Sequence, residues 1–306
     1  EDSIANALNS AFNQTWDNKE IIVVDDCSVD GSMQAIQTAI KNSKTPINII
    51  KHDTNRGPAA ARNTILTNAN GTVLVFFDDD DVSFPERINT QYELMKDYEL
   101  STGISLIACY ASGIRKYPNN YKKELQAIGS IGSTPPSGTE LVDYLLFYKK
   151  NNKRFYGSGT PTCSLMAKLS TFRKVGGFDE TLRRVEDADF AIRLAMLGGY
   201  FIGTTDKLFM QLATEAIDKS PEKNLEAEQR LAHKNKKYLI SIGKYYYSLH
   251  WPLLRYCHFK RKYVRLIITL VGLFIRNPLL TTTHFLNTGP KRLLHERKMN
   301  ESGESL

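Results

Sequence analysis

The chain has 306 residues, 42% of them hydrophobic and 24% charged, which is ordinary for a globular protein with a sizeable core and excludes a low-complexity chain. Its net charge of +7 is uneven, because residues 233–306 carry 14 Lys and Arg against 3 Asp and Glu, whereas residues 1–232 carry 26 against 30. The charge therefore predicts an anionic partner for the C-terminal quarter alone.

The first hundred residues alternate helical and strand patterns. Helices are predicted at residues 4–12, 33–40, 58–69 and from Pro85 onward, and strands at 21–24, 47–50 and 72–77. The strands at 21–24 and 72–77 are apolar on both faces, which is typical of a parallel sheet covered by helices on both sides. Ligands bind beyond the carboxyl ends of such strands. Two acidic clusters, Asp25–Asp26 and Asp78–Asp81, follow strands and are expected on the same rim.

The pattern is less regular after residue 100. A strand is predicted at 106–110, an irregular insertion at 111–140, a helix at 138–150, a strand at 163–167, a turn at 172–182, a helix at 187–197, and long helices from about Pro221. The four cysteines, Cys27, Cys109, Cys163 and Cys257, are scattered without a CxxC pair. They predict reduced structural thiols in a cytoplasmic protein rather than a disulfide framework.

Three groups of carboxylates are candidates for chemistry. The run Asp78–Asp81 can ligate a hard divalent cation that relieves its own repulsion; the alternative is an acidic turn in which Asp81 and Glu86 cap a helix. Asp25 and Asp26 can accept from a base N–H or a ribose hydroxyl, whereas Ser28 or Asp30 could simply cap the next helix. Glu186, Asp187 and Asp189 begin a helix, where one capping carboxylate is ordinary and three exceed what a cap requires.

Four runs in this order and spacing resemble family 2 glycosyltransferases of the GT-A fold. They are NQTWDNKEIIVVDDCSVDGS, NRGPAAARNTIL, NGTVLVFFDDDDVSFPERI and KVGGFDETLRRVEDADFAIRLAMLGGYF, and together they cover about residues 1–205. The resemblance implies an α/β fold with a mostly parallel central sheet, helices on both faces and a C-terminal helical extension. It places a GT-A domain at 1–220, with a nucleotide-binding half at 1–105 and an acceptor half at 106–220, followed by a basic helical extension at 221–306.

The resemblance also implies roles for individual residues. Asp26, with Asp25 beside it, would contact the nucleotide base, and Arg62 would line the nucleotide site. The DxD motif falls on Asp78, toward the ribose, and Asp80, toward a Mg²⁺ or Mn²⁺ ion on the diphosphate, while the role of Asp79 is left open. Asp187, preceded by Glu186, would be the catalytic base. The implied activity is hexosyl transfer, by inversion, from a nucleotide-sugar, with UDP favoured, to a glycan or lipid-linked acceptor in polysaccharide biosynthesis at the cell envelope.

Two features depart from the family pattern. The family opens with a strand of the type SVIIPxYN, and this sequence starts just after the place of that strand, so it is expected to lack it. The family often has a histidine after its last core strand, whereas residues 209–220 contain none. His233 lies further along on a predicted helix and is expected to be solvated or in the core, which leaves any further metal ligand unassigned.

The basic C-terminal segment predicts a membrane contact. Its uninterrupted apolar run, residues 266–275, is far shorter than the roughly 20 residues that span a bilayer. Basic and aromatic residues surround this run within residues 244–280, as in helices that lie in a membrane interface. The protein is thus expected in the cytoplasm, peripheral on the inner face of the membrane. A helix docked on the catalytic domain is the alternative, and no nucleic-acid motif is present.

Two other functions remain as alternatives. Residues 78–82 also satisfy the DxDxV nucleophile pattern of haloacid dehalogenase-type phosphatases, although that fold places the motif on its opening strand. A non-catalytic, membrane-associated scaffold is the second alternative, and the retained Asp80 and Asp187 argue against it.

Overall fold

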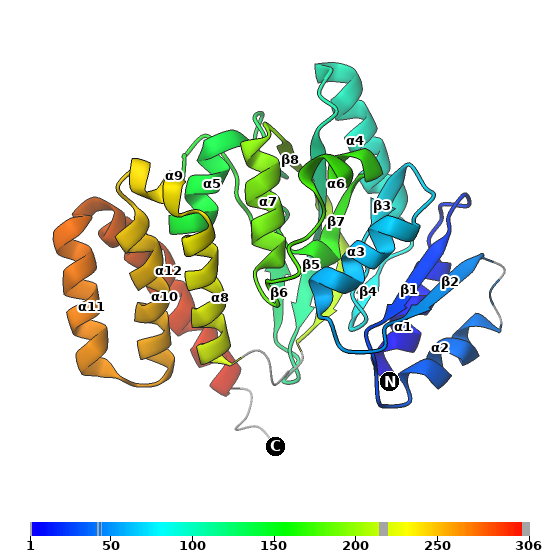
Figure 1. Ribbon diagram of the computed structural model, residues 1–306, viewed down its shortest axis with the longest axis horizontal. Coiled ribbons are helices and arrows are strands. Elements are labelled where there is room, and N and C mark those ends of the chain that lie inside the picture. The colour runs from blue at the N-terminus through cyan, green and yellow to red at the C-terminus, as the bar shows by residue number, and fades with distance from the viewer. Residues whose placement is uncertain (1, 42, 44, 214–219, 302–306) are drawn as a thin grey trace. The chain divides into compact units, whose positions relative to one another are not determined.

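The computed structural model describes residues 2–41, 43, 45–213 and 220–301 (Figure 1). The described chain forms two compact units. The first unit contains residues 1–116, 122–141 and 151–214, and the second contains residues 117–121, 142–150 and 215–306. The predicted domain boundary at residue 220 stays a prediction, and the structure adds two short segments from the middle of the chain to the second unit.

The first unit begins with a parallel pair of strands. Strand β1 (Ile21–Asp25) pairs with β2 (Ile47–Lys51), with Ile21 opposite Ile47 and Asp25 opposite Lys51. The helices of this region are α1 (Asp2–Phe12), α2 (Ser32–Ile40) and α3 (Pro58–Asn68). Residues 21–24 are only partly buried, so the prediction of a fully buried strand is wrong at this position.

A second, six-stranded sheet has the order β3-β7-β5-β8-β4, with β6 paired to β5. Its strands are β3 (Val73–Val75), β4 (Asp81–Ser83), β5 (Ile107–Lys116), β6 (Lys122–Leu125), β7 (Leu165–Lys168) and β8 (Tyr200–Leu212). Only β5 and β8 are parallel in it; the other four pairings are antiparallel. The α/β class is confirmed, but the sheet is mixed rather than mostly parallel. The prediction failed because an apolar strand covered on both faces has the same sequence pattern in a parallel and in an antiparallel pairing.

Four stretches differ from the prediction. Strand β4 was not predicted, because three residues are too few to show an alternating pattern. The expected insertion at 111–140 contains the end of β5 and all of β6. Residues 172–175 of the expected turn at 172–182 instead belong to helix α6 (Leu169–Val175), which ends at Gly176 with a φ of 86°. The long strand β8 was not predicted, because its middle residues 205–207 are exposed and interrupt the apolar pattern.

Helices pack against the sheets and contribute further buried residues to the first unit. Helix α4 (Arg87–Thr102) places Met95 against Ile107 and Met166 of the sheet. Helix α7 (Glu186–Met196) and helix α6 lie in front of the sheet in Figure 1. The short helix η1 (Thr162–Ser164) completes the unit's elements, whereas α5 (Gly138–Phe147) begins in this unit and has residues 142–147 in the second. The start of α7 and the end of β3 carry the carboxylates that the sequence singled out.

The second unit is helical, as predicted from Pro221 onward. Its helices are α8 (Pro221–Lys234), α9 (Lys236–Ser241), α10 (Tyr245–Phe259), α11 (Tyr263–Arg276) and α12 (Pro278–Glu301). Leu239, Tyr247, Trp251 and Leu273 form its core with Phe147. Across the described ranges, we find no helix that is both long and apolar enough to cross a membrane.

Candidate functional site

A buried arginine joins two of the predicted acidic groups. Arg62 lies in the middle of α3, and its side chain is 12% exposed. Its Nη1 donates to Glu186 Oε1 at 2.5 Å, and its Nη2 lies 3.4 Å from Asp78 Oδ1. Burial alone would lower the pKa of Arg62, but the charges of Asp78, Glu186 and Asp187 hold it above its ordinary value. One cation thus connects the turn after β3 with the start of α7, although 124 residues separate Arg62 from Glu186.

The start of α7 holds Asp187 partly buried beside Glu186. Burial first, and then the charge of Glu186, raise the pKa of Asp187 to about 6. Ala188 N donates to Asp187 Oδ1 at 2.7 Å. Val185, just before the helix, has a φ of 58°, which is strained for a β-branched residue. A carboxylate with this pKa is a base at neutral pH and can accept a proton from a hydroxyl group.

The third carboxylate of α7 has a structural partner. Asp189 is buried, and Arg193 Nε donates to its Oδ2 at 2.8 Å. The same arginine donates from Nη1 to Val175 O and from Nη2 to Gly177 O, each at 2.8 Å. Asp189 and Arg193 therefore tie α7 to the turn after α6.

The four consecutive aspartates have different surroundings. Asp79 is exposed, whereas Asp78 and Asp80 are partly buried and Asp81 is only 4% exposed at the start of β4. Neither carboxylate oxygen of Asp81 has a hydrogen-bond partner within the described part of the chain. Helix α4 begins at Arg87, so the interpretation of Asp81 as a helix cap is wrong. Burial first, and then the charges of Asp78 and Asp80, raise the pKa of Asp81 to about 7.

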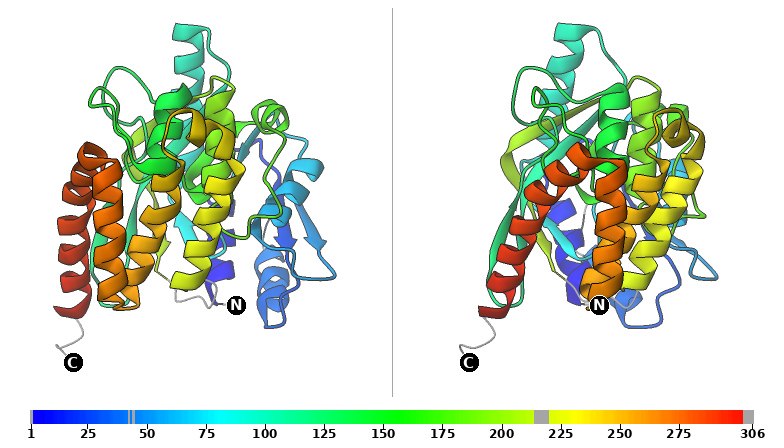
Figure 2. Two further views of the ribbon diagram at one scale, coloured as in Figure 1. Left: turned by 60° about the vertical axis from the view of Figure 1, so that its left-hand side comes forward. Right: turned by 90° about the vertical axis from the view of Figure 1, so that its left-hand side faces the viewer.

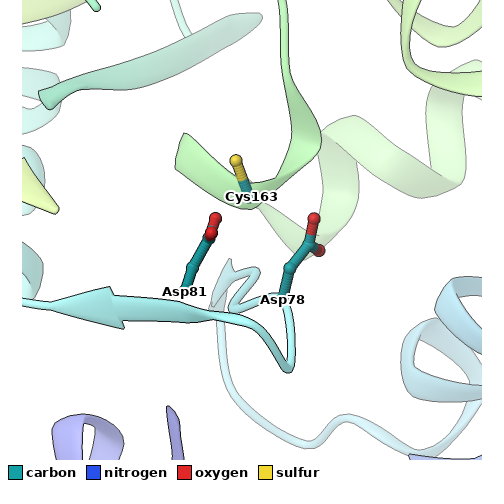
Figure 3. Close-up of side chains that lie close together, drawn as sticks. All are labelled: Asp78, Asp81 and Cys163. Carbon is teal, nitrogen blue, oxygen red and sulfur yellow. The ribbon is translucent and has the colours of Figure 1, made fainter. Parts of the chain in front are cut away.

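Asp81 faces Asp78 and the thiol of Cys163 (Figure 3). One ligand atom from each of these three residues lies within 4.8 Å of the other two. Cys163 comes from η1, just before β7, so its proximity to the aspartates could not be seen in the sequence. Carboxylate oxygens suit Mg²⁺ and Mn²⁺, and two buried oxygens without partners are an arrangement that a cation would stabilise. This group shares Asp78 with the predicted metal-binding pair of Asp78 and Asp80, but it does not include Asp80.

Asp26 organises the loop that leads into α3. Its Oδ1 accepts from His52 Nδ1 at 2.7 Å and from Arg56 N at 2.9 Å, and its Oδ2 accepts from Gly57 N at 2.6 Å. Burial raises the pKa of Asp26, but these hydrogen bonds outweigh it and leave the pKa below its ordinary value. Gly57 has a φ of 90°, which suits glycine, and Pro58 opens the helix. Asp26 therefore sets the position of α3, and with it that of Arg62.

Asp25 is more deeply buried than its neighbour. Its Oδ1 accepts from Ser28 N at 2.8 Å, and Lys51 Nζ lies 3.9 Å from its Oδ2. The structure thus places Asp25 and Asp26 at the end of β1. Asp26 accepts a hydrogen bond from Gly57 just before α3, and Arg62 of α3 lies 3.4 Å from Asp78.

The sequence reading missed two residues that support the site. His52 follows β2 directly, and its Nε2 is hydrogen-bonded to Thr64 Oγ1 of α3 at 2.9 Å. Its position directly after a strand, like that of Asp26, was the signal that could have revealed it. Tyr110 of β5 is buried, and burial and the charge of Asp187 raise the pKa of its hydroxyl. His233, by contrast, is hydrogen-bonded to Tyr245 in the second unit, and residues 214–219 lie outside the described residues.

Replacing Asp26 by Asn is expected to lower the free energy of unfolding by about 1–3 kcal/mol at neutral pH, because an amide cannot accept all three hydrogen bonds. The pKa of Asp26 is below its ordinary 3.8 in the folded protein, so the advantage of the wild type is present above that value and is lost as the pH falls below it. Urea denaturation at several pH values measures this. Asp53→Asn, at an exposed neighbour, is the control, and an equal loss in both variants would contradict the assignment.

Comparisons with known proteins add an independent finding. Residues 1–169 match the family model described as "Glycosyl transferase family 2". WfaP of Escherichia coli, a UDP-Glc:α-D-GlcNAc-diphosphoundecaprenol β-1,3-glucosyltransferase, is 32% identical over 64% of this chain and 66% of its own length. Several other curated relatives are matched over 47–62% of their length, so the chain spans about half of them.

Two solved structures share the fold. TarS 1–349 of S. aureus in complex with UDP-GlcNAc has a TM-score of 0.54 at 17% identity, covering 92% of this chain and 79% of that one. The mannosyltransferase PcManGT from Pyrobaculum calidifontis, in complex with GDP-Man and Mn²⁺, has a TM-score of 0.52 at 16% identity, covering 99% and 79%. The chain therefore has a GT-A-like glycosyltransferase fold.

Proposed function

The chain belongs to glycosyl transferase family 2, and from this premise we propose that it transfers a hexose from a nucleotide-diphosphate donor to a hydroxyl group of a glycan or lipid-linked acceptor. The observation that carries the proposal is the bridge from Arg62 to Asp78 and Glu186, which holds a donor-side carboxylate beside a candidate base. Neither the phosphatase nor the scaffold alternative explains why these groups converge on one cation. The family match also speaks against the phosphatase.

The chemistry follows from the positions of these residues. Asp187 accepts the proton of the acceptor hydroxyl, the hydroxyl oxygen bonds to the anomeric carbon, and the bond from that carbon to the diphosphate breaks. Attack opposite the leaving group inverts the anomeric centre. The raised pKa of Asp187 makes it a stronger base than an ordinary aspartate while it stays largely ionised at pH 7. Glu186 and Arg62 position α7 and supply the charges around this base.

A divalent cation, Mg²⁺ or Mn²⁺, would complete the donor site. Asp78 and Asp80 of the DxD motif are the proposed ligands. Asp78, Asp81 and Cys163 form the second candidate set, because one ligand atom of each lies within 4.8 Å of the other two. When bound, such an ion stabilises the negative charge on the departing diphosphate. The complex of PcManGT with GDP-Man and Mn²⁺ supports the use of a metal.

The two candidate ligand sets make different predictions. Asp80→Ala is expected to weaken Mn²⁺ binding in the presence of UDP by about tenfold or more, because a hard ligand is lost. Cys163→Ala is expected to leave Mn²⁺ affinity within about twofold, because the thiol is not a ligand when Asp78 and Asp80 hold the ion. Loss of the electron paramagnetic resonance signal of free Mn²⁺ measures the binding. The reverse ranking would assign the ion to Asp78, Asp81 and Cys163.

We assign the nucleoside to the end of β1 and the turn after β3. Asp25 and Asp26 are the proposed contacts to the base, Arg62 lines the site, and Asp78 faces the ribose. UDP is the favoured nucleotide, which the UDP-GlcNAc complex of TarS and the UDP-Glc donor named for WfaP support. A base contact by Asp26 would be additional to its three hydrogen bonds with the protein.

A lipid-linked acceptor places the reaction at a membrane. The acceptor named for WfaP is a diphosphoundecaprenol, which supports an acceptor of this class. We therefore propose a peripheral position on the inner face of the cytoplasmic membrane, with contact to anionic lipids through the basic C-terminal segment, predicted at residues 244–280.

A donor screen tests the proposed function. The protein is incubated with Mn²⁺ and a panel of UDP- and GDP-hexoses, and released nucleoside diphosphate is quantified. Release above the protein-free background from at least one UDP-hexose is expected. Release of inorganic phosphate from phosphate monoesters, without any reaction of nucleotide-sugars, would instead support the phosphatase alternative.

A further inference from the structure

Helix α11 has apolar residues on two opposite faces. One face, with Leu266, Leu270 and Leu273, packs against the core of the second unit. The opposite face carries six apolar side chains that are 50–75% exposed: Val264, Ile267, Ile268, Val271, Phe274 and Ile275. Their spacing of three and four residues places them on one side of the helix. The burial of α11 in its own unit therefore accounts for only half of its apolar surface.

The exposed apolar surface continues on helix α12. Leu279, Leu286 and Leu293, one every seven residues, are 59–82% exposed together with Leu294. Figure 2 shows α11 in orange and α12 in red side by side. A groove of about 340 Å³ between them is lined by Val271, Phe274, Phe285 and Leu286, among others. We call the exposed apolar side chains of this helix pair, within residues 263–294, the apolar face.

Most of the exposed large hydrophobic side chains are concentrated on the apolar face. Of the 21 large hydrophobic side chains that are exposed among the described residues, 12 belong to the apolar face. The other nine are spread over residues 29–259. Single exposed hydrophobic residues are ordinary, whereas a contiguous apolar patch marks an interaction surface.

Positive charge accompanies the apolar face. Residues 260–301 contain nine Lys and Arg against two Glu. Arg265 and Arg276 are exposed and eleven residues apart, or about three helical turns, so they lie on the same side of α11. Arg261, Lys262 and the exposed aromatic ring of Tyr263 stand at its start. A helix with this composition fits the boundary between lipid headgroups and acyl chains.

We propose that the apolar face of α11 and α12 inserts into the interface of an anionic bilayer, with Arg261, Arg265 and Arg276 on the lipid phosphates. This deepens the membrane contact of the proposed function and rests on it for the choice of partner. Helix α11 has 14 residues, too few to cross a bilayer, so it lies along the surface.

This proposal places the contact on α11 and α12 rather than on the whole of the predicted residues 244–280. Tyr247, Trp251, Leu254 and Cys257 of α10 are buried, so that helix belongs to the core. A second copy of the chain is a less suitable occupant of the apolar face. Pairing two such faces would bring two sets of nine cationic side chains together, whereas anionic lipids neutralise them.

Flotation of the protein with vesicles tests the proposal without any sugar transfer. The wild type is expected to float with vesicles of equal parts phosphatidylglycerol and phosphatidylcholine. The double variant Ile267→Ser, Phe274→Ser should lower the partition coefficient at least about tenfold, because two inserted side chains are lost. Arg261→Gln with Arg265→Gln should lower it about tenfold on these vesicles but leave it unchanged on pure phosphatidylcholine.

Leu100→Ser is the matched control, because Leu100 is 76% exposed on α4 in the first unit, and it should float like the wild type. Circular dichroism confirms that each variant is folded. Asp187→Asn should also float normally, so a failed transfer assay and a failed membrane assay are distinguishable. Equal flotation of the Ile267→Ser, Phe274→Ser variant would overturn the proposal. Dissociation of a dimer by the same variant, seen in sedimentation, would assign the face to a second copy instead.

Discussion

Asp187→Asn is expected to lower the rate of sugar transfer about a thousandfold and to leave UDP affinity within about twofold, because an amide cannot accept the acceptor's proton. Asparagine has nearly the size of aspartate, and its amide oxygen can still accept from Ala188 N. The loss should therefore come from chemistry rather than from unfolding. Transfer of radiolabelled sugar and calorimetric titration of UDP separate the two effects. Unchanged turnover would remove Asp187 as the base.

The pH dependence of transfer gives a second test of this base. In the wild type, transfer should fall as the pH is lowered through about 6, because the raised pKa of Asp187 leaves it protonated below that value. Glu186→Gln removes a like charge that raises this pKa, so the fall should move to lower pH. A midpoint that stays in place would show that another group controls the rate.

Arg62→Met is expected to lower the free energy of unfolding by about 3–5 kcal/mol, because it leaves Glu186 and Asp78 without their shared cation. The side chains of Arg62 and Glu186 are only 12% and 11% exposed, so water compensates little. Methionine keeps a similar length and an apolar stem, so the lost charge accounts for most of the effect. Urea denaturation followed by circular dichroism measures the loss.

Arg56→Met provides the matched control for Arg62. Arg56 makes the same kind of ion pair, with Glu180 at 2.9 Å, but the side chains are 47% and 41% exposed. Solvent screens such a pair, and its loss should cost less than about 1 kcal/mol. If the free energy of unfolding falls equally in both variants, the buried ion pairs of Arg62 with Asp78 and Glu186 contribute no more to stability than an exposed ion pair does.

Most elements of the first hundred residues were predictable because their signals are local, although strand β4 was not predicted. The helices expected at 4–12, 33–40 and 58–69 appear as α1, α2 and α3, since each shows its apolar spacing and boundaries within one short segment. Strand β8 could not be found in this way. Its exposed centre and the register shifts in its pairing with β5 interrupt the alternation that identifies a strand.

Much of the site depends on contacts that the sequence does not contain. The four aspartates at 78–81 look equivalent as letters, and only the fold buries Asp81 and exposes Asp79. The contacts that give Arg62 and Asp26 their surroundings come from residues far away in the chain, Glu186 and His52. The order of the motifs predicted candidate site residues, and the tertiary structure determines which of these residues contact one another.

Calorimetric titration of UDP in the presence of Mn²⁺ tests whether the carboxylates around Arg62 form the nucleotide site. The wild type should bind UDP saturably, and Asp78→Ala should weaken binding about tenfold or more, because it removes the proposed ribose contact. Asp97→Ala, an exposed aspartate on α4, should bind like the wild type. Equal affinity of the wild type and Asp78→Ala would contradict the account and place the nucleotide elsewhere.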